Sequence, residues 1–131
     1  MEGATIYDPL RRKQVARTPE EEVRQGVIAW LRDSKGVPET RMESEWGFSY
    51  NRRRYRADVV VFSRNLQPLL LVECKAPDVR IDEKVIEQVV RYTRVLPVQY
   101  IWITNGTEHY VLGRSEAGGF VSLSSFPESL G

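Results

Sequence analysis

Three apolar runs dominate the middle of this 131-residue chain, and charged residues interrupt two of them. The run "LLLVECKAP", residues 69–77, places Glu73 and Lys75 beside aliphatic residues. The run "YRADVVVF", residues 55–62, carries Asp58 in the same way, whereas "VQYIWIT", residues 98–104, is apolar on both faces. Such runs predict buried strands, and the fully apolar one predicts a central strand. The chain is therefore expected to fold around a sheet that holds charges inside it.

Helical patterns flank these strands. Thr18, Pro19 and Glu21 predict a helix start with a capping box, and apolar residues then recur at helical spacing through residues 20–34. Asp82 predicts the N-cap of a second helix over residues 82–96. Further strands are expected at 40–48 and 107–112, with turns at 49–54 and at Asn105-Gly106. The order α-β-β-β-α-β-β predicts an α/β fold with a central mixed sheet flanked by helices.

The three charged residues are expected to meet. Side chains two apart share one face of a strand, so Glu73 and Lys75 point to one side and Cys74 to the other. If the two charged runs pair as antiparallel partners, Asp58 lies near Glu73. Two carboxylates in apolar surroundings stay ionised only beside a cation, which Lys75 supplies in part and a divalent Mg²⁺ or Mn²⁺ completes. The alternative is an ordinary ion pair at a sheet edge.

Several short blocks together resemble a known family. Asp58 followed by Glu73-x-Lys75 is similar to the PD-(D/E)xK motif of restriction-endonuclease-like nucleases. The blocks "TPEEEVRQ", "YRADVVVF", "LLLVECKAP", "EQVVRY" and "ITNG" resemble, in this order, the N-terminal nuclease domain of type I restriction enzyme R subunits. The resemblance covers roughly residues 18–113 and implies the αβββαβ core of that family.

The resemblance also implies roles in the strands. Asp58 and Glu73 would ligate a divalent metal ion, with the backbone carbonyl of Cys74 as a third ligand. Lys75 would orient or activate the attacking water and steady charge on the phosphate. Hydrolysis of a phosphodiester bond needs an acidified water and a cation on the phosphate oxygens, and a carboxylate-bound metal ion supplies both.

Two further matches fall on the helices. The acid of the first helix lies within "PEEE"; Glu21 is preferred because its spacing to Gln25 gives it an inward face, and Glu20 stays open. The pattern Q-x-x-x-Y matches Gln88 and Tyr92. Gln88 is expected beside the apolar stripe as a partner of the Glu73 and Lys75 pair, with a boundary glutamine bonded to backbone as the alternative.

Arginines gather in the turn before the Asp58 strand. The segment "YNRRRYR", residues 50–56, places Arg52, Arg53, Arg54 and Arg56 near one end of the sheet. These side chains are expected to contact DNA phosphates, and the alternative is a solvated charged turn. Fifteen of the 19 basic residues are arginine, a bias that suits recognition of phosphate.

Length and composition fit one domain at residues 18–122, preceded by an arm at 1–17 and followed by a polar tail at 123–131. A single cysteine excludes an internal disulfide and a cysteine-cluster metal site. With no membrane-length apolar stretch or signal peptide, a cytoplasmic protein is expected.

The function expected from these features is metal-dependent, endonuclease-type hydrolysis of DNA in a restriction system. Restriction-modification subunits or a second copy of the chain are the expected partners. The alternatives are an accessory module that binds DNA without cleaving it and a protein whose charges form a structural network.

Overall fold

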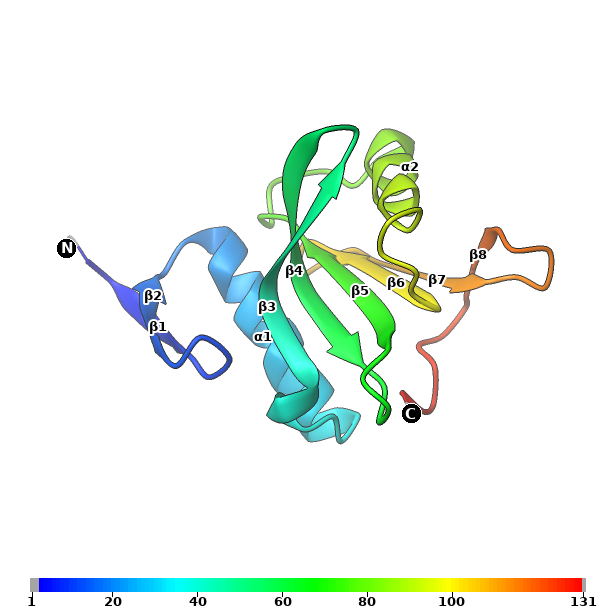
Figure 1. Ribbon diagram of the computed structural model, residues 1–131. Coiled ribbons are helices and arrows are strands. Elements are labelled where there is room, and N and C mark those ends of the chain that lie inside the picture. The colour runs from blue at the N-terminus through cyan, green and yellow to red at the C-terminus, as the bar shows by residue number, and fades with distance from the viewer. Residues whose placement is uncertain (1–2, 131) are drawn as a thin grey trace.

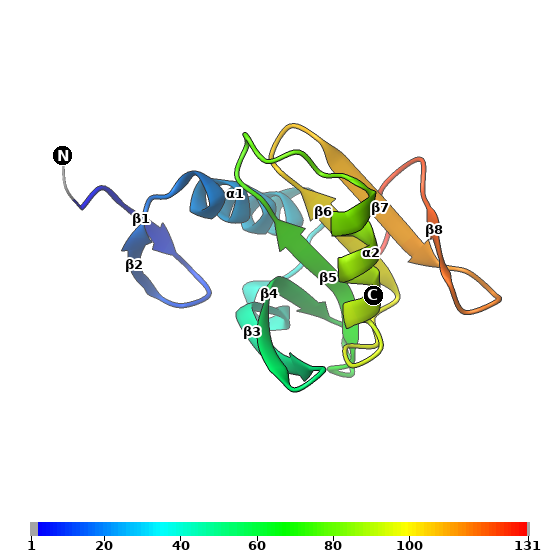
Figure 2. The same cartoon turned by 90° about the horizontal axis from the view of Figure 1, so that it is seen from above.

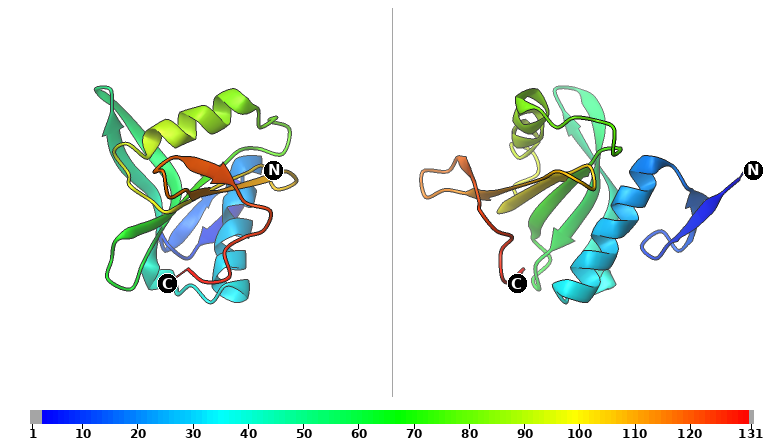
Figure 3. Two further views of the ribbon diagram at one scale, coloured as in Figure 1. Left: turned by 90° about the vertical axis from the view of Figure 1, so that its right-hand side faces the viewer. Right: turned by 180° about the vertical axis from the view of Figure 1, so that it is seen from behind.

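The computed structural model describes residues 3–130 and has three layers, a twisted sheet between two helices (Figures 1 and 3). Six strands form the sheet in the order β3-β4-β5-β6-β7-β8, and only β5 and β6 are parallel neighbours. Their bounds are β3 Met42–Tyr50, β4 Arg53–Phe62, β5 Pro68–Cys74, β6 Tyr100–Thr104, β7 His109–Arg114 and β8 Phe120–Ser122. The expected mixed sheet flanked by helices, with a central strand at β6, is confirmed.

Each helix covers one face of the sheet. Helix α1 (Pro19–Ser34) packs Ile28 and Leu31 against one core, whereas α2 (Glu83–Tyr92) packs Val89 against the other. Figure 2 shows α1 and α2 on opposite sides of β5 and β6. Alternate residues of β5 feed the two cores, since Val72 belongs to the α1 side and Leu71 to the α2 side. A parallel strand buried on both faces explains the continuous apolar run in this part of the sequence.

The helix starts follow the sequence signals only in part. The Thr18 hydroxyl accepts from the Glu21 N–H at 3.0 Å, and Asp82 accepts from the Val85 N–H in the same way. The Glu21 carboxylate does not close a capping box, because it pairs with Arg11 instead. The second helix ends at Tyr92 rather than at residue 96. From Thr93 to Val95 each backbone N–H donates to the carbonyl three residues earlier, so the α-helical pattern stops there.

The N-terminal arm contains regular structure that its sequence does not predict. Strands β1 (Thr5–Asp8) and β2 (Lys13–Ala16) form an antiparallel hairpin. Asp8 closes its turn by accepting from the N–H groups of Leu10 and Arg11, and Arg12 adopts a φ of 55°. The hairpin is too short to show a periodic pattern in the sequence, which is why it was missed.

The C-terminal segment also packs on the domain. Phe126 contacts Trp30 and Trp102 edge-on at ring distances of 4.8 and 5.2 Å, and Leu130 is buried. Strand β8 was not among the expected strands, because three residues are too few to show a strand pattern. No helix within residues 3–130 is long and apolar enough to cross a membrane.

Candidate active site

The charged strands meet as the sequence predicts. Strands β4 and β5 are antiparallel with Val59 opposite Val72, so Asp58 and Glu73 occupy the next rung of the ladder. Asp58 is buried, and its Oδ2 atom accepts a hydrogen bond of 2.7 Å from the backbone N–H of Cys74. The carboxylate of Asp58 is therefore fixed by the strand that carries Glu73 and Lys75.

Glu73 and Lys75 lie on one side of β5. The Lys75 Nζ atom is 3.6 Å from Glu73 Oε2, and the side chain of Glu73 is 15% exposed. Burial raises the pKa of Glu73 to about 8, and the neighbouring charge of Asp58 adds to the effect while Lys75 opposes it. The backbone N–H of Lys75 donates to the carbonyl of Thr104 at 2.8 Å, which holds the end of β5 against β6. Because the pKa of Glu73 stays raised, Lys75 offsets only part of the effect of burial and of the Asp58 charge.

Arg24 is a site residue that the sequence reasoning missed. Its Nη2 atom lies 3.0 Å from Asp58 Oδ1, and the arginine is 7% exposed. The Nε atom is buried without a hydrogen-bond partner among the described residues. A signal was present, because residue 24 stands on the same helical stripe as the core residues Val27, Ile28 and Leu31. A charge on such a stripe indicates a buried partner.

The N-terminal hairpin reaches this arginine through two carboxylates. Arg11 Nη2 lies 2.7 Å from Glu21, Arg11 Nη1 lies 2.9 Å from Glu45, and Arg11 Nε pairs with Asp8. Glu21 Oε1, the same oxygen that pairs with Arg11, lies 3.7 Å from Arg24 Nη1, and Glu45 Oε2 lies 3.9 Å from it. Glu45 adopts a φ of 54°, which interrupts the β3–β4 ladder opposite Asp58. A chain of ion pairs therefore connects the hairpin to Asp58.

The two first-helix candidates differ in their surroundings. Glu21 is engaged by Arg11 and by the side-chain amide of Gln25 at 3.0 Å. The pKa of Glu20 is raised by partial burial and then by the charge of Asp58, with opposing effects of Arg24 and Lys75. Glu21 is buried and lies 3.7 Å from Arg24, the partner of Asp58, whereas Glu20 is exposed, so the choice between the two acids stays a prediction.

The residues of the second helix also differ from each other. Tyr92 is 8% exposed, and burial followed by the charge of Glu73 raises its pKa to about 12. Gln88 is exposed and makes no hydrogen bond within the described part of the chain. The expected role of Gln88 as a partner of Glu73 or Lys75 therefore stays a prediction. The stripe of α2 passes through Val89 and Tyr92 instead, one position further along.

The side chains of Cys74 and His109 could in principle act as nucleophiles, but both have structural surroundings. Cys74 is buried in the core on the α1 side, and burial raises the pKa of its thiol well above the usual value. The ring of His109 contacts Trp102 and the Thr104 hydroxyl, away from Asp58. Neither group is placed for nucleophilic attack near the carboxylate pair.

The four arginines expected to contact DNA lie on the β3–β4 ribbon rather than in one turn. Arg52 is at the turn, and Arg53, Arg54 and Arg56 belong to β4. All four are exposed. Successive strand residues face opposite sides, so Arg54 and Arg56 share one face and Arg53 is on the other.

The donor set fits a hard divalent cation only with help from backbone and water. No three side chains of His, Cys, Asp or Glu among residues 3–130 gather in a metal-binding arrangement. Two neighbouring carboxylates, Asp58 and Glu73, are present, and Glu20 adds a third negative charge against the cations of Arg24 and Lys75. These oxygen donors would suit Mg²⁺ or Mn²⁺, and the Cys74 carbonyl and water would have to complete the shell.

Most of the chain, including the residues of this site, matches a known protein family. Residues 19–127 match the family model described as Type I restriction enzyme R protein N terminus (HSDR_N). The chain belongs to this family. The match covers both helices and strands β3 to β8, including Asp58, Glu73 and Lys75, and it confirms the relation to PD-(D/E)xK nucleases.

A solved structure agrees with the fold of this HSDR_N chain. A protein from Anabaena variabilis ATCC 29413, described as a candidate nuclease of DUF820, superimposes with a TM-score of 0.53 at 13% identity. The alignment covers 95% of this chain and 79% of the other. At that identity the likeness concerns the fold, and it confirms the expected restriction-endonuclease-like core. The comparison with curated proteins found no match.

Proposed function

We propose that this HSDR_N chain hydrolyses DNA phosphodiester bonds with the help of a divalent metal ion. The observation that carries the proposal is the pairing of buried Asp58 with half-buried Glu73, with Lys75 Nζ 3.6 Å from Glu73. Membership in the type I restriction enzyme R protein N-terminus family supports a nuclease of this kind. Isolated carboxylates at such a position are costly, and a cation that joins them removes the cost.

Each residue of the site has a defined task in this proposal. Asp58 and Glu73 hold the metal ion together with the Cys74 carbonyl, and a bound ion supplies an acidified water and charge stabilisation on the phosphate. Lys75, whose side chain is 32% exposed, reaches solvent and donates to the attacking water or a phosphate oxygen. An acid of the first helix, Glu21 or Glu20, adds negative charge at the rim of the site.

The direct test is cleavage of supercoiled and linear DNA in Mg²⁺ or Mn²⁺ by the parent chain and by Lys75→Ala. Lys84→Ala is the matched control, because Lys84 is an exposed lysine on α2. We expect cleavage that requires metal, survives in Lys84→Ala and is lost in Lys75→Ala. Equal cleavage by both variants would remove Lys75 from the mechanism.

A specific observation supports one alternative, an accessory module that binds DNA without cutting it. Both oxygens of Asp58 already accept hydrogen bonds, from Arg24 and from the Cys74 N–H. A carboxylate oxygen has a second lone pair, so metal binding stays compatible with these bonds. Metal-independent DNA binding with no cleavage by the parent chain would favour the accessory module.

The cellular role follows from the family. We propose that the chain acts in DNA restriction, beside restriction-modification subunits or as a homodimer that cuts both strands. Size-exclusion chromatography coupled to light scattering, with and without DNA, tests the dimer. A monomer in both conditions would leave the partner subunits as the source of the second cut.

A further inference from the structure

The outer part of the β3–β4 ribbon extends beyond the rest of the sheet. Strand β5 pairs with β4 only from Val59 onward, so the segment from residue 47 to 57 pairs within the ribbon alone (Figure 1). One face of this segment is covered, because Phe48 and Tyr55 lie 5.0 and 4.9 Å from the Tyr92 ring of α2. The other face is free of α2.

Two arginines occupy the free face. Arg54 pairs across the ladder with Ser49, and Arg56 pairs with Gly47. These small partners leave a polar hollow of about 480 Å³ along the ribbon. The Arg56 side chain is 72% exposed, and its guanidinium is 3.5 Å from Glu45. Cross-strand neighbours of this size cannot cover the arginine stems, so both guanidinium groups face solvent.

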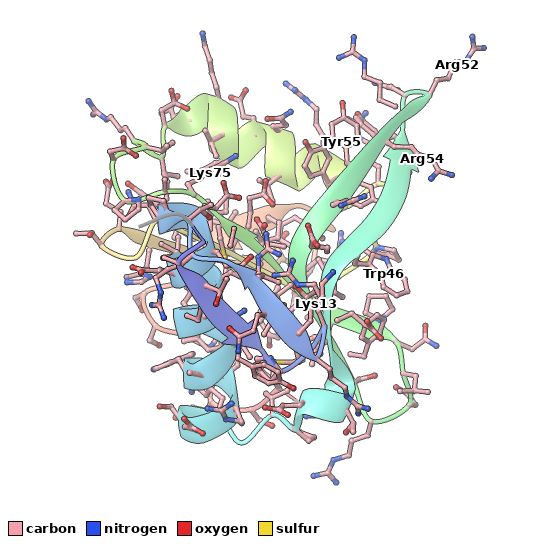
Figure 4. All side chains as sticks on the ribbon, turned by 90° about the vertical axis from the view of Figure 1, so that its left-hand side faces the viewer. Lys13, Trp46, Arg52, Arg54, Tyr55 and Lys75 are labelled. Atoms are coloured by element: carbon pink, nitrogen blue, oxygen red, sulfur yellow. The ribbon has the colours of Figure 1, made fainter. Side chains whose placement is uncertain are left out.

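The N-terminal hairpin lies against the base of the same face. Arg11 of the hairpin turn contacts Glu45 at 2.9 Å, so the turn and Arg56 share one carboxylate. Arg12 and Lys13 follow Arg11 and are exposed. Figure 4 looks onto this side of the molecule, with Lys13 near the ribbon, Arg54 farther out and Lys75 toward the active site. The hairpin and the ribbon thus present cations to one side.

Two segments that form this side of the molecule carry positive charges only. The hairpin turn "PLRRKQ", residues 9–14, and the ribbon segment "WGFSYNRRRYRA", residues 46–57, contain seven arginines and lysines and no acid. A surface of this kind attracts a polyanion, and arginine suits phosphate oxygens in particular. Glu45, between the two segments, is already paired with arginines and does not oppose an anion by itself.

We propose that the hairpin turn and the free face of the ribbon form one phosphate-binding surface for duplex DNA. Arg12 and Lys13 contact the backbone on one side, and Arg54 and Arg56 contact it on the other. The inference rests on the proposed function for its choice of DNA as the polyanion. A protruding two-stranded ribbon fits the wide major groove of B-form DNA, whereas the major groove of A-form RNA is too narrow to admit it. Arg53, on the face toward α2, has no part in the surface.

Fluorescence anisotropy with a short labelled DNA duplex tests the surface in EDTA, where cleavage cannot interfere. The dissociation constant is measured across a salt series, since each lost phosphate contact lowers the salt slope by about 0.9. Arg54→Ala/Arg56→Ala is compared with Arg53→Ala, a neighbouring exposed arginine of the same strand. Lys13→Ala is compared with Lys84→Ala. Thermal unfolding is recorded for all variants, which change exposed side chains only.

We expect the double variant to lower the salt slope by about 2 and Lys13→Ala by about 1, with both control variants unchanged. A loss in Arg53→Ala as large as in Arg54→Ala/Arg56→Ala would overturn the assignment of the face. A Lys13→Ala slope equal to that of Lys84→Ala would remove the hairpin from the surface. Equal affinity for an RNA duplex of the same sequence would overturn the choice of DNA.

The plasmid cleavage test separates this inference from the proposed function. Parent protein that cleaves DNA but binds it independently of Lys13, Arg54 and Arg56 keeps the function and loses the surface. Parent protein that binds through these residues but never cleaves keeps the surface and loses the nuclease.

Discussion

Replacing Glu73 by glutamine should stabilise the metal-free protein at high pH. In the folded chain, burial and the charge of Asp58 raise the pKa of Glu73 from 4.5 to about 8. In the unfolded chain the carboxyl group keeps its ordinary value. Below pH 4.5 the group is protonated in both states and costs nothing. Between pH 4.5 and 8 only the unfolded state ionises it, so the free energy of unfolding falls as the pH rises.

The size of the effect follows from the width of that pH window. A shift from 4.5 to about 8 corresponds to up to about 5 kcal/mol at 1.36 kcal/mol per unit. Glutamine cannot ionise, and its amide can still donate to Asp58. Glu73→Gln should therefore match the parent near pH 4.5 and exceed it by several kcal/mol above pH 8.

Urea denaturation in EDTA between pH 4.5 and 9 measures this difference. Glu87→Gln is the control, since Glu87 is an exposed carboxylate on α2 whose side chain is 64% exposed. Added Mg²⁺ should restore the stability of the parent at high pH and leave Glu73→Gln unchanged, because the metal ion needs the ionised carboxylate. Parallel pH profiles of the free energy of unfolding for parent and Glu73→Gln would refute the raised pKa of Glu73 in the folded chain.

Three substitutions test the packing around the site. Arg24→Met leaves Asp58 buried without its cation, so we expect urea denaturation to show a free energy of unfolding lower by about 3 kcal/mol. A decrease below about 0.5 kcal/mol would mean that the ion pair is dispensable for stability. Leu130→Ala should cost about 2–3 kcal/mol, because the residue is buried, and an unchanged midpoint would detach the C-terminal segment from the core. Gly106→Ala should lower the melting temperature by several degrees, since φ is +92° and the new methyl group meets Val23 at 3.3 Å; an equal melting temperature would contradict strain at this turn.

The core of the fold was accessible from the sequence because local patterns decided it. Apolar runs predicted β4, β5 and β6, and the helix caps Thr18 and Asp82 predicted the two helix starts. The short strands at both ends were not accessible. A four-residue hairpin strand such as β1 has no periodic signal, and the hairpin is tied to the domain by Arg11, which pairs with the distant residues Glu21 and Glu45.

The same distinction applies to the site: residues placed by local patterns were predictable, and residues placed by distant neighbours were not. The spacing within one strand placed Glu73 and Lys75 on one side, and strand pairing brought Asp58 to them. The acid of the first helix depended on which neighbours the fold supplies, because helical spacing favoured Glu21 without excluding Glu20. Arg11 reaches Glu21 from the N-terminal hairpin and engages its carboxylate, whereas partial burial and the charge of Asp58 raise the pKa of Glu20. If Arg11→Ala frees Glu21, the loss of cleavage caused by Glu20→Gln should become smaller in that background. Equal losses in both backgrounds would show that the hairpin does not determine which of the two carboxylates serves the site.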